Sequence, residues 1–566
     1  MVASASPALS LMGLRIALDT DVPTAAVSAA GLGVLFHVTV LRNLEVDNFM
    51  YHLLSSLLAA TVMLTFAYVL VGFSFLSALS RTCLASLSFN TGLFLSIAIY
   101  RVFFHRLRKF PGPFGAKVSR FYSAYLAGKE VKYFKEIERM HHRYGDFIRT
   151  GPREVAIVRK SAVPLLLGPT SECRKSTWYM QVDSDSSKCS IHMTRDFDDH
   201  KRRRKAWDRG FAIKALSTYE PRIKRKVDQF IAQLSQAQAP LNGTAWSMYL
   251  SFDIMGEVGF GKDFGGVSSG TEHPAIKGIH SHMEILGIMS HLPWLLNLLS
   301  RVPGAAAPYA GFFGWCAAEI KAKQRDWNPD QYPQDIVSWL LKAFVENDAA
   351  ASPSEEALHE DSRVVIIAGS ETTATTLATV LYYLAKYPAV LKKLQSKIDA
   401  AMPTAADWTY DKVKSITYID DIIHESLRLK PALLTGGYRV TPPEGLQVDE
   451  QYIPGDTNVF VPVQLIHTDP RYWKQAEDFV PERFGERRDE MGTDGAPFIP
   501  FSLGAYSCPG KNLAILSLRL AVSRIAQQLN VSFAPGETGE RFDKEALDTF
   551  TTTLPPVMIQ FSERKL

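Results

Sequence analysis

The sequence is poor in cysteine, and its few cysteines are not spaced as in metal sites or disulfide frameworks. Five occur in 566 residues, at Cys83, Cys173, Cys189, Cys316 and Cys508. None forms a CxxC pair, which argues against a zinc cage, and an odd, scattered set argues against a disulfide framework. This usage suits a reducing compartment.

The chain also lacks a strong net charge of either sign. Its 62 Lys and Arg residues nearly balance 58 Asp and Glu residues, which leaves a formal charge of +4. No nucleic-acid-binding surface therefore stands out from composition. A length of 566 residues allows a large core and more than one domain.

Residues 1–109 differ from the rest because they contain three apolar stretches, Ala25 to Val40, Leu53 to Leu79 and Cys83 to Tyr100. The second is uncharged and long enough to span a bilayer, and the third is near the lower limit. The first is shorter and carries His37. We predict a membrane region with two or three spans, and buried core helices are the alternative interpretation.

A basic cluster after the third stretch indicates the topology. Arg101, Arg106, Arg108 and Lys109 favour a cytosolic location for the chain that follows. Three spans would then put the N-terminus in the lumen, and two would put it in the cytosol. A cleavable signal peptide is not expected, because no basic segment leads into a short apolar core. Prolines and glycines from residue 110 to 115 break the helix and set a stiff turn.

One cysteine stands between two glycines in the run Phe501-Ser502-Leu503-Gly504-Ala505-Tyr506-Ser507-Cys508-Pro509-Gly510. Residues 509–529 repeat apolar residues at near-helical spacing, and Pro509 fits the first position of that helix. Cys508 would then lie at a helix N-terminus, where unpaired N–H groups favour a thiolate. Such a thiolate suits an axial haem ligand. A buried structural cysteine in a glycine-rich turn is the alternative.

A second unusual segment lies inside a predicted helix, which Ser352 would cap and which would run to about Lys386. Within it, Ala368-Gly369-Ser370-Glu371-Thr372-Thr373 places a glycine and an acid among apolar residues. A mid-helix glycine costs about 1 kcal/mol relative to alanine, and a buried acid is also costly. Two such penalties at one point indicate a functional site. The alternative is a packing glycine beside threonines that bond their own helix.

Three further segments carry charge in a pattern. The dense basic run that begins at His200 is most simply a solvated helix face or a nucleic-acid patch. Glu425 and Arg428 are three residues apart on a predicted helix, and an ordinary surface pair of this kind contributes about 0.2–0.5 kcal/mol. Pro481-Glu482-Arg483-Phe484 follows before the cysteine run.

Taken together, these segments resemble the motifs of the cytochrome P450 superfamily in their usual order. The cysteine run is similar to the family's haem-binding loop, Phe-x-x-Gly-x-Arg/His-x-Cys-x-Gly, at Phe501, Gly504, Cys508 and Gly510. Tyr506 departs from that pattern, because the family usually has a cation there to pair with a haem propionate. The resemblance covers about residues 110–566 and is nearest to fungal, membrane-bound members.

The resemblance implies a mainly α fold with small β-sheets around a buried haem b, preceded by the transmembrane region. Residues 1–109 would be the membrane region, and residues 110–566 the haem-thiolate monooxygenase domain on the cytosolic face of the endoplasmic reticulum. The enzyme would insert one oxygen atom from O2 into a lipophilic small molecule, such as a terpenoid or another secondary metabolite. Electrons would come from an NADPH-dependent flavoprotein reductase. A haem-thiolate isomerase or dehydratase, or a non-catalytic membrane haem protein, are the alternatives.

The same resemblance implies which residues hold the haem. Cys508 would bind the iron, and the loop glycines would let the backbone pass close to a flat group. His200 and Arg204 lie one helical turn apart and would reach the propionates, together with Arg439. The remaining cations of the basic run would form a docking surface for the acidic reductase.

It also implies roles in catalysis and folding. Gly369 would make room for O2, and Thr372 and Glu371 would relay protons during oxygen activation. A buried network that fixes the cysteine loop would comprise Glu425, Arg428 and Arg483. An apolar substrate pocket would be lined by Ile366, Ile367, Leu433, Leu434 and Phe550.

Overall fold

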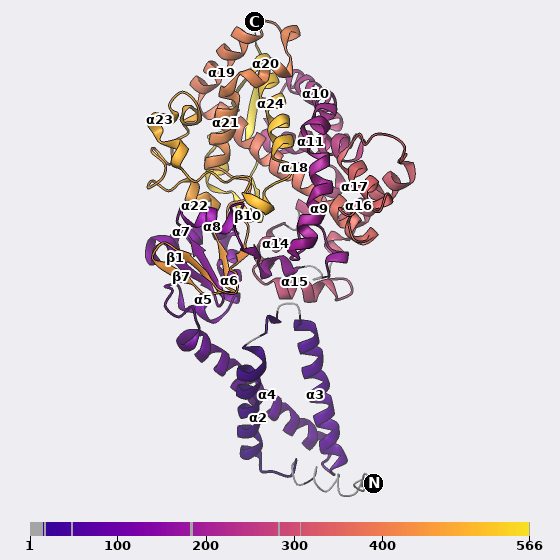
Figure 1. The fold of residues 1–566 in the computed structure, drawn as a ribbon, viewed down its shortest axis with the longest axis vertical. Coiled ribbons are helices and arrows are strands. Elements are labelled where there is room, and N and C mark those ends of the chain that lie inside the picture. The colour runs from indigo at the N-terminus through magenta and orange to yellow at the C-terminus, as the bar shows by residue number, and fades with distance from the viewer. Residues whose placement is uncertain are drawn as a thin grey trace.

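The computed structural model describes residues 15, 18–42, 44–46, 49–181, 185–280, 283–305 and 307–564. Figure 1 shows two parts, a group of long N-terminal helices at the bottom and a larger, mainly helical part above them. Residues 1–14, 16, 17, 43, 47 and 48 of the predicted membrane region lie outside the described residues.

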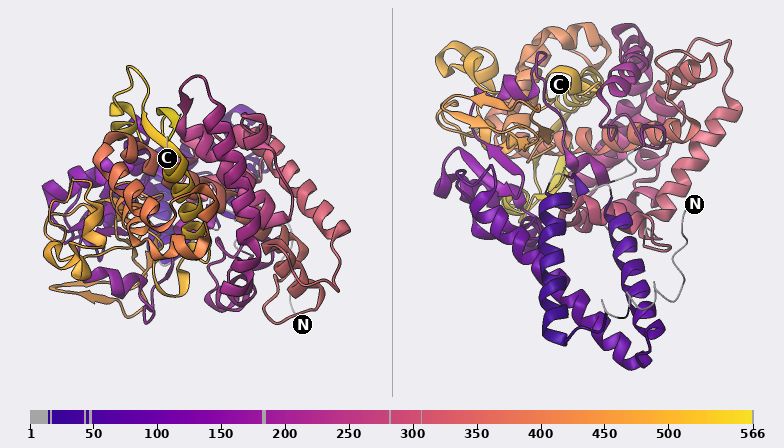
Figure 2. Two further views of the ribbon diagram at one scale, coloured as in Figure 1. Left: turned by 90° about the horizontal axis from the view of Figure 1, so that it is seen from above. Right: turned by 60° about the horizontal axis from the view of Figure 1, so that its bottom comes forward.

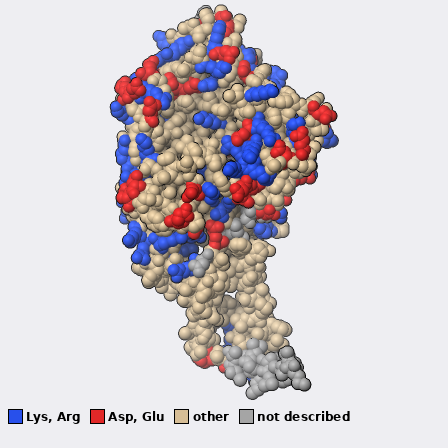
Figure 3. Space-filling model, in the orientation of Figure 1, with Lys and Arg blue, Asp and Glu red and all other residues tan. Residues whose placement is uncertain are grey.

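The N-terminal part consists of α2 (Val22–Phe36), α3 (Met50–Leu70) and α4 (Phe75–Ile99). Short π-helical segments, η1 (His37–Leu41) and η3 (Tyr100–Phe104), continue the first and the third. All three helical stretches are long and apolar enough to cross a membrane, and Figure 3 shows few charged side chains on them.

The predicted stretch Leu53 to Leu79 is not one helix. Gly72 has a positive φ of 104°, and the Ser74 hydroxyl accepts a hydrogen bond from the Ser77 N–H at 3.4 Å. A glycine with positive φ ends a helix, and a serine at the N-cap position, here Ser74, begins the next one. The chain therefore turns back between α3 and α4, which gives three separate helical stretches.

Small residues hold α2 against α4. A Cβ on Gly33 would lie 2.1 Å from the Phe89 carbonyl oxygen, and a Cβ on Gly92 would lie 2.1 Å from the Ala30 carbonyl oxygen. His37 Nδ1 and Ser96 Oγ are 2.8 Å apart across the same contact. Close backbone approach and interhelical hydrogen bonds are what join helices where the hydrophobic effect cannot.

The larger part is mainly helical, and α18 runs through its middle beside α11, α21 and α24. Its helices are α5 (Phe114–Val118), α6 (Phe121–Glu130), α7 (Tyr133–Tyr144), α8 (Ala162–Leu167), α9 (Phe197–Gly210), α10 (Ile213–Gln236), α11 (Gly243–Met255), α12 (Gly266–Ser269), α13 (Pro274–His280), α14 (Met283–Met289), α15 (Pro293–Ser300), α16 (Ala307–Asp326), α17 (Ile336–Val345), α18 (Glu355–Lys386), α19 (Pro388–Ala401), α20 (Tyr410–Ser415), α21 (Thr417–Leu429), α22 (Val463–His467), α23 (Arg488–Met491), α24 (Lys511–Gln528) and α25 (Glu540–Lys544). Although α18 is apolar enough to span a bilayer, most of it is buried in this part, so it is a core helix.

Small sheets lie beside and between the helices (Figure 2). The largest has the order β1-β2-β8-β5-β3, another has the order β4-β12-β9, and two hairpins pair β6 with β7 and β10 with β11. The strands are β1 (Phe147–Gly151), β2 (Glu154–Ile157), β3 (Arg174–Lys175), β4 (Leu241–Asn242), β5 (Arg439–Val440), β6 (Leu446–Val448), β7 (Gln451–Ile453), β8 (Asn458–Phe460), β9 (Leu529–Phe533), β10 (Leu547–Thr549), β11 (Thr551–Thr553) and β12 (Met558–Glu563). This architecture confirms the predicted fold class.

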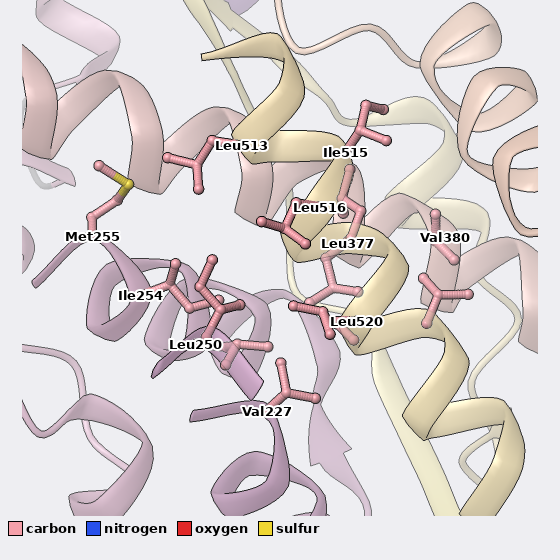
Figure 4. Packing of buried hydrophobic residues seen from close by; sticks show 14 of the residues in the cluster. Val227, Leu250, Ile254, Met255, Leu377, Val380, Leu513, Ile515, Leu516 and Leu520 are labelled. Atoms are coloured by element: carbon pink, nitrogen blue, oxygen red, sulfur yellow. The ribbon is translucent and has the colours of Figure 1, made fainter. Parts of the chain in front are cut away.

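The main core joins the helix that carries the threonines to the helix that follows the cysteine. Figure 4 shows apolar side chains of α11, α18 and α24 meeting there, among them Leu250, Ile254, Met255, Leu377, Val380, Leu513, Leu516 and Leu520. Each fully buried aliphatic side chain contributes about 1.5–3 kcal/mol. The relative position of the two candidate motifs is therefore fixed by core packing.

Helix boundaries differ slightly from the sequence prediction. The cap of α18 is Ser354, whose hydroxyl accepts from the Ala357 N–H at 3.0 Å, whereas Ser352 donates to Asp361 at 2.7 Å. The helix ends at Lys386, as predicted. Pro509 lies two residues ahead of α24, which has Gly510 at its cap position. A serine beside a buried carboxylate is drawn away from capping, so the cap moves to the next serine.

Candidate haem-thiolate site

The loop that carries Cys508 is closed by its own backbone. The Cys508 N–H donates to the Phe501 carbonyl oxygen at 2.9 Å. Gly504 has a φ of 62°, and a Cβ there would lie 2.4 Å from the Gly168 carbonyl oxygen. Only glycine fits this position, so the loop presents Cys508 in one fixed orientation.

The Cys508 thiol differs from the other cysteines of the larger part. Cys173, Cys189 and Cys316 are buried, whereas Cys508 is accessible. Burial among neighbouring atoms raises the pKa of Cys508, while the N–H of Gly510, the Arg204 guanidinium and Lys511 lower it. A thiol that is enclosed by protein yet accessible borders an internal cavity, and N–H groups aimed at its sulfur stabilise the thiolate.

Buried basic side chains surround Tyr506, which precedes Cys508 by two residues in the loop. The Arg439 guanidinium lies 4.7 Å from the ring centre of Tyr506, and Lys175 Nζ lies 5.3 Å from it. Burial and Arg439 hold the pKa of Lys175 well below its ordinary value. The Tyr506 hydroxyl, Arg439 Nε and His200 Nδ1 are buried without a protein partner. Such a group of donors is suited to an anionic ligand.

His200 and Arg204 reach the cysteine loop from α9. The His200 ring lies 4.7 Å from the Tyr506 ring, and burial lowers the pKa of His200 to about 2. Arg204 Nη1 donates to the Ser507 carbonyl oxygen at 2.6 Å, and its Nε donates to Asp208 at 2.6 Å. Arg204 therefore braces the loop backbone, while His200 belongs to the group around Tyr506. Their contact with propionates stays a prediction.

The middle of α18 has one accessible face inside the protein. Ala368 is exposed, and Gly369 and Thr372 are half-buried, although most of the helix is buried. The Thr372 hydroxyl donates to the Ala368 carbonyl oxygen at 2.7 Å. A Cβ on Gly369 would lie 2.4 Å from Met255 Sδ, so this glycine allows α11 to approach α18. Its role in admitting O2 stays a prediction.

Glu371 is buried beside that face. Thr551 Oγ1 donates to Glu371 Oε2 at 2.7 Å. Burial raises the pKa of Glu371, although His280 and the Thr551 hydrogen bond lower it. A perturbed acid beside an accessible cavity is a candidate for proton transfer.

The Glu-x-x-Arg segment lies in a fully enclosed network. Arg428 makes two hydrogen bonds to Glu425, at 2.7 and 2.8 Å, and Arg483 Nε donates to Glu425 Oε1 at 2.9 Å. All three side chains have no accessible surface. The remaining Arg428 and Arg483 donors bind carbonyl oxygens of residues 467–478. The network therefore holds the segment that precedes the cysteine loop.

The predicted pocket residues have different surroundings. Ile367, Leu433 and Phe550 are half-buried, Leu434 is buried, and Ile366 is fully buried in the main core. The Phe550 ring stacks on Trp178 with centroids 4.6 Å apart. Because Ile366 has no accessible surface, it contributes to core packing rather than to an open wall.

Sequence reasoning missed several residues of the site. Lys175 is one, because a lysine at the end of a two-residue strand gives no motif. Arg203 and Asp361 are others, with Nη2 and Oδ2 2.6 Å apart and no more than 1% of either side chain exposed. Arg203 was part of the basic run, and its helical phase could have separated a buried position from the exposed ones.

The chain matches the family profile described as Cytochrome P450 over residues 111–561. The cytochrome P450 monooxygenase FCK2 of Fusarium pseudograminearum (strain CS3096) is 35% identical over 538 residues, which cover 94% of this chain and 96% of that protein. The cytochrome P450 monooxygenase orf5 of Eupenicillium brefeldianum is 37% identical and covers 84% of this chain and 94% of its own. Tryprostatin B 6-hydroxylase of Aspergillus fumigatus is 31% identical over 84% of each chain.

A solved structure agrees in fold. The crystal structure of a cytochrome P450, CYP102L1, superposes with a TM-score of 0.64 at 20% identity and covers 76% of this chain and 94% of its own. The chain belongs to the cytochrome P450 family. It is a monooxygenase of that family, as the sequence predicted, and the family implies haem iron and O2.

The residues present fit a haem. An accessible thiol with N–H groups aimed at its sulfur suits the iron, and the buried cations and unpaired donors around Tyr506 suit the propionate carboxylates. A bound anion would favour the charged form of Lys175, and Lys175 and Arg439 would then together supply the positive charge that the family pattern has at position 506.

Proposed function

We propose that this P450 inserts one oxygen atom from O2 into a lipophilic small molecule of secondary metabolism, with electrons from NADPH through a flavoprotein reductase. The observation that carries the proposal is the accessible, N–H-stabilised thiol of Cys508 at the fixed turn before α24. Bound haem would supply the oxidation chemistry, with the thiolate as its axial ligand.

The protein would hold haem at both its iron and its carboxylates. Cys508 would bind the iron, and Lys175, Arg439 and the Tyr506 hydroxyl would bind the propionates. Burial of Lys175 and Arg439 makes their contacts to a carboxylate stronger than they would be in water. His200 would add a hydrogen bond from Nδ1, which lacks a protein partner.

Proton supply would depend on α18. The Thr372 hydroxyl is bonded to its own helix and lies on the accessible face, so it can exchange that bond for one to a molecule in the cavity. Glu371, whose pKa burial raises, would hold a proton more readily than an exposed acid and could pass it on. The pair would thus deliver protons while the core keeps bulk water out.

The proposed pocket favours an apolar substrate. Leu433, Leu434 and Ile367 are aliphatic, and the stacked Phe550 and Trp178 add an aromatic wall. Phe550 has a positive φ of 80°, a backbone state that non-glycine residues rarely adopt, which fixes its ring against Trp178. The name of the Aspergillus relative, a hydroxylase of tryprostatin B, supports C–H hydroxylation as the reaction.

The outer face of α9 would receive the reductase. Lys201, Lys205 and Arg209 are exposed there, and Figure 3 shows Lys and Arg side chains gathered over this helix. Clustered charge of one sign speeds association with a partner of the opposite sign. Arg204, on the same helix, binds the backbone next to Cys508, so docking would occur beside the loop.

The three apolar helices would anchor the enzyme in the endoplasmic reticulum membrane, with the catalytic domain in the cytosol. Their length and hydropathy support three spans, and the basic residues that follow α4 support the cytosolic orientation.

One experiment tests the reaction. The full chain, co-expressed with an NADPH-dependent flavoprotein reductase, is supplied with a panel of lipophilic small molecules, and products are analysed by mass spectrometry with 18O2. We expect a product that gains one labelled oxygen atom and requires NADPH. The Cys508→Ser variant, expressed in parallel, should give none. A product that forms without O2 would contradict the proposal.

A further inference from the structure

A histidine of α13 faces the buried acid of α18. His280 Nε2 lies 3.8 Å from Glu371 Oε1, and His280 Nδ1 lies 2.5 Å from Glu272 Oε1. Glu371 Oε2 is occupied by the Thr551 hydroxyl. Each carboxylate oxygen of Glu371 thus has a different neighbour. Oε2 accepts a hydrogen bond, whereas Oε1 is 3.8 Å from His280 Nε2, beyond hydrogen-bond distance.

His280 and Glu272 are both more accessible than Glu371. The Glu371 side chain is 8% exposed, whereas His280 and Glu272 are 29% and 28% exposed. A proton could therefore enter from water at His280 and reach an acid that water itself barely touches. Most histidines in the catalytic part that lie among cations or in the core have lowered pKa values, as His192, His291 and His467 do. Two acids raise the pKa of His280 instead.

The charges around His280 come from two places. Among the described residues, the charged groups that act on its pKa are Glu272, just before α13, and Glu371 of α18. Charged side chains of α16, which packs against α13, do not act on it within that part of the chain. The imidazole therefore titrates between two carboxyl groups only.

We propose that His280 is the residue that supplies protons to Glu371, with Glu272 fixing the imidazole in the orientation that serves this transfer. This inference rests on the proposed function, because it gives the acid of the oxygen-activation site a route to solvent. His280 acts through Glu371 and is a positioning and relay residue rather than a catalytic one.

The proton balance follows from the two ring nitrogens. Glu272 keeps the proton on Nδ1 because of the short contact between them. The imidazolium proton on Nε2 passes to Glu371 Oε1 when that carboxylate has given up its own proton. This leaves a neutral imidazole with Nδ1–H still bonded to Glu272. Nε2 then regains a proton from water at the exposed edge of the ring, and no electrons are transferred.

The first test needs neither reductase nor substrate. Melting temperatures of the haem-loaded full chain are measured for the wild type, His280→Gln, Glu371→Gln and the double variant, at about pH 6 and about pH 9. A raised histidine pKa stabilises the fold below its unfolded value, and that stability is lost as pH rises through the raised value. We expect non-additive effects near pH 6 and additive effects near pH 9. Additivity at both pH values would overturn the contact.

The second test measures use of the relay. Product formed per NADPH consumed is followed against pH, with the substrate that the co-expression screen identifies. We expect His280→Gln to lower this ratio by about 3-fold or more, and to flatten its pH dependence, while peroxide release rises. The control is His359→Gln, which removes a histidine near the start of α18 that contacts Gln324. A wild-type ratio and pH profile in His280→Gln would overturn the relay.

The two inferences can fail separately. If Glu371→Gln lowers coupling but His280→Gln does not, the proposed function stands and the relay through His280 falls. If no NADPH-dependent oxygenated product forms at all, the proposed function falls, while the double-mutant cycle still decides whether His280 and Glu371 interact.

Discussion

Two buried glutamates of this protein are held in opposite ways. Glu425 has no accessible surface, and both arginines of its network, together with the Val480 N–H, donate to it at 2.7–2.9 Å. Glu371 is also nearly buried, but it has one hydrogen-bonded oxygen and one oxygen 3.8 Å from an imidazole.

The difference separates a structural charge from an exchangeable one. Glu425 is hydrogen-bonded by two arginines in a fully enclosed network, so loss of either partner would leave a buried charge uncompensated. Glu371 accepts a hydrogen bond from a hydroxyl and faces a histidine, a residue type that can exchange protons, so it can take part in proton exchange. Burial alone therefore does not show whether an acid has a role in folding or in chemistry, and its partners do.

The largest effect is expected when Cys508 itself is replaced. Cys508→Ser should abolish the red-shifted Soret band of the reduced CO complex, because a hydroxyl does not replace the thiolate ligand. The measurement is the reduced-CO difference spectrum of the purified protein. Cys83→Ser, at an exposed cysteine of α4, is the control and should keep the band. A surviving band in Cys508→Ser would show that the ligand is another residue.

The second largest effect is expected in the buried network of Glu425, Arg428 and Arg483. Arg428→Ala leaves the charge of Glu425 buried with one arginine fewer, which should cost about 3–5 kcal/mol and release haem. Thermal unfolding and haem content report it. Arg487→Ala removes a partner of Glu490 at the surface and should have little effect. If Arg428→Ala kept the wild-type melting temperature, Glu425 would not be the structural charge in this comparison.

A smaller effect is expected on the exchangeable side. Thr372→Ala should keep haem and the fold but direct oxygen consumption toward peroxide by several-fold, because the accessible hydroxyl is lost. Product and peroxide per NADPH are measured together. Thr376→Ala, one turn along on the same helix and bonded to the Thr372 carbonyl oxygen, is the matched control. Unchanged coupling in Thr372→Ala would argue against the proton role of this face.

The smallest effect is expected at Tyr506. Tyr506→Arg should be tolerated in the haem-loaded protein, since it restores the family's usual cation, whereas Lys175→Ala should lose haem faster. The rate of haem transfer to an excess of apomyoglobin measures both. If Tyr506→Arg lost haem faster than Lys175→Ala, the tyrosine would have a contact of its own that the cations do not replace.

Much of the site could be predicted from sequence because its parts are local. The loop around Cys508 needs two glycines and a cysteine within seven residues, and Glu425 with Arg428 needs one helical turn. Local residue types also account for the hairpin of β1 and β2 and for the end of α7, whose cap Gly145 has a φ of 85°.

The rest depends on contacts between distant segments. Lys175 and Arg439 meet because β3 pairs with β5, and His280 meets Glu371 across 91 positions of the chain. The space around Gly369 is set by Met255 of another helix, and the role of this glycine in admitting O2 stays a prediction. Such contacts leave no signal within a single segment, because tertiary packing determines which distant residues meet.

One contact joins the two parts of the molecule and predicts how the chain would cross a bilayer. Arg195 Nη1 of the catalytic part lies 3.0 Å from Glu45 Oε2, between α2 and α3. A loop that bonds the catalytic part would share its compartment. With the catalytic part in the cytosol, as proposed, α2 would run toward the cytosol, α3 would run away from it and α4 would return. Residues 71–74 would then face the lumen, where a protease added to sealed vesicles should not reach an inserted cleavage sequence.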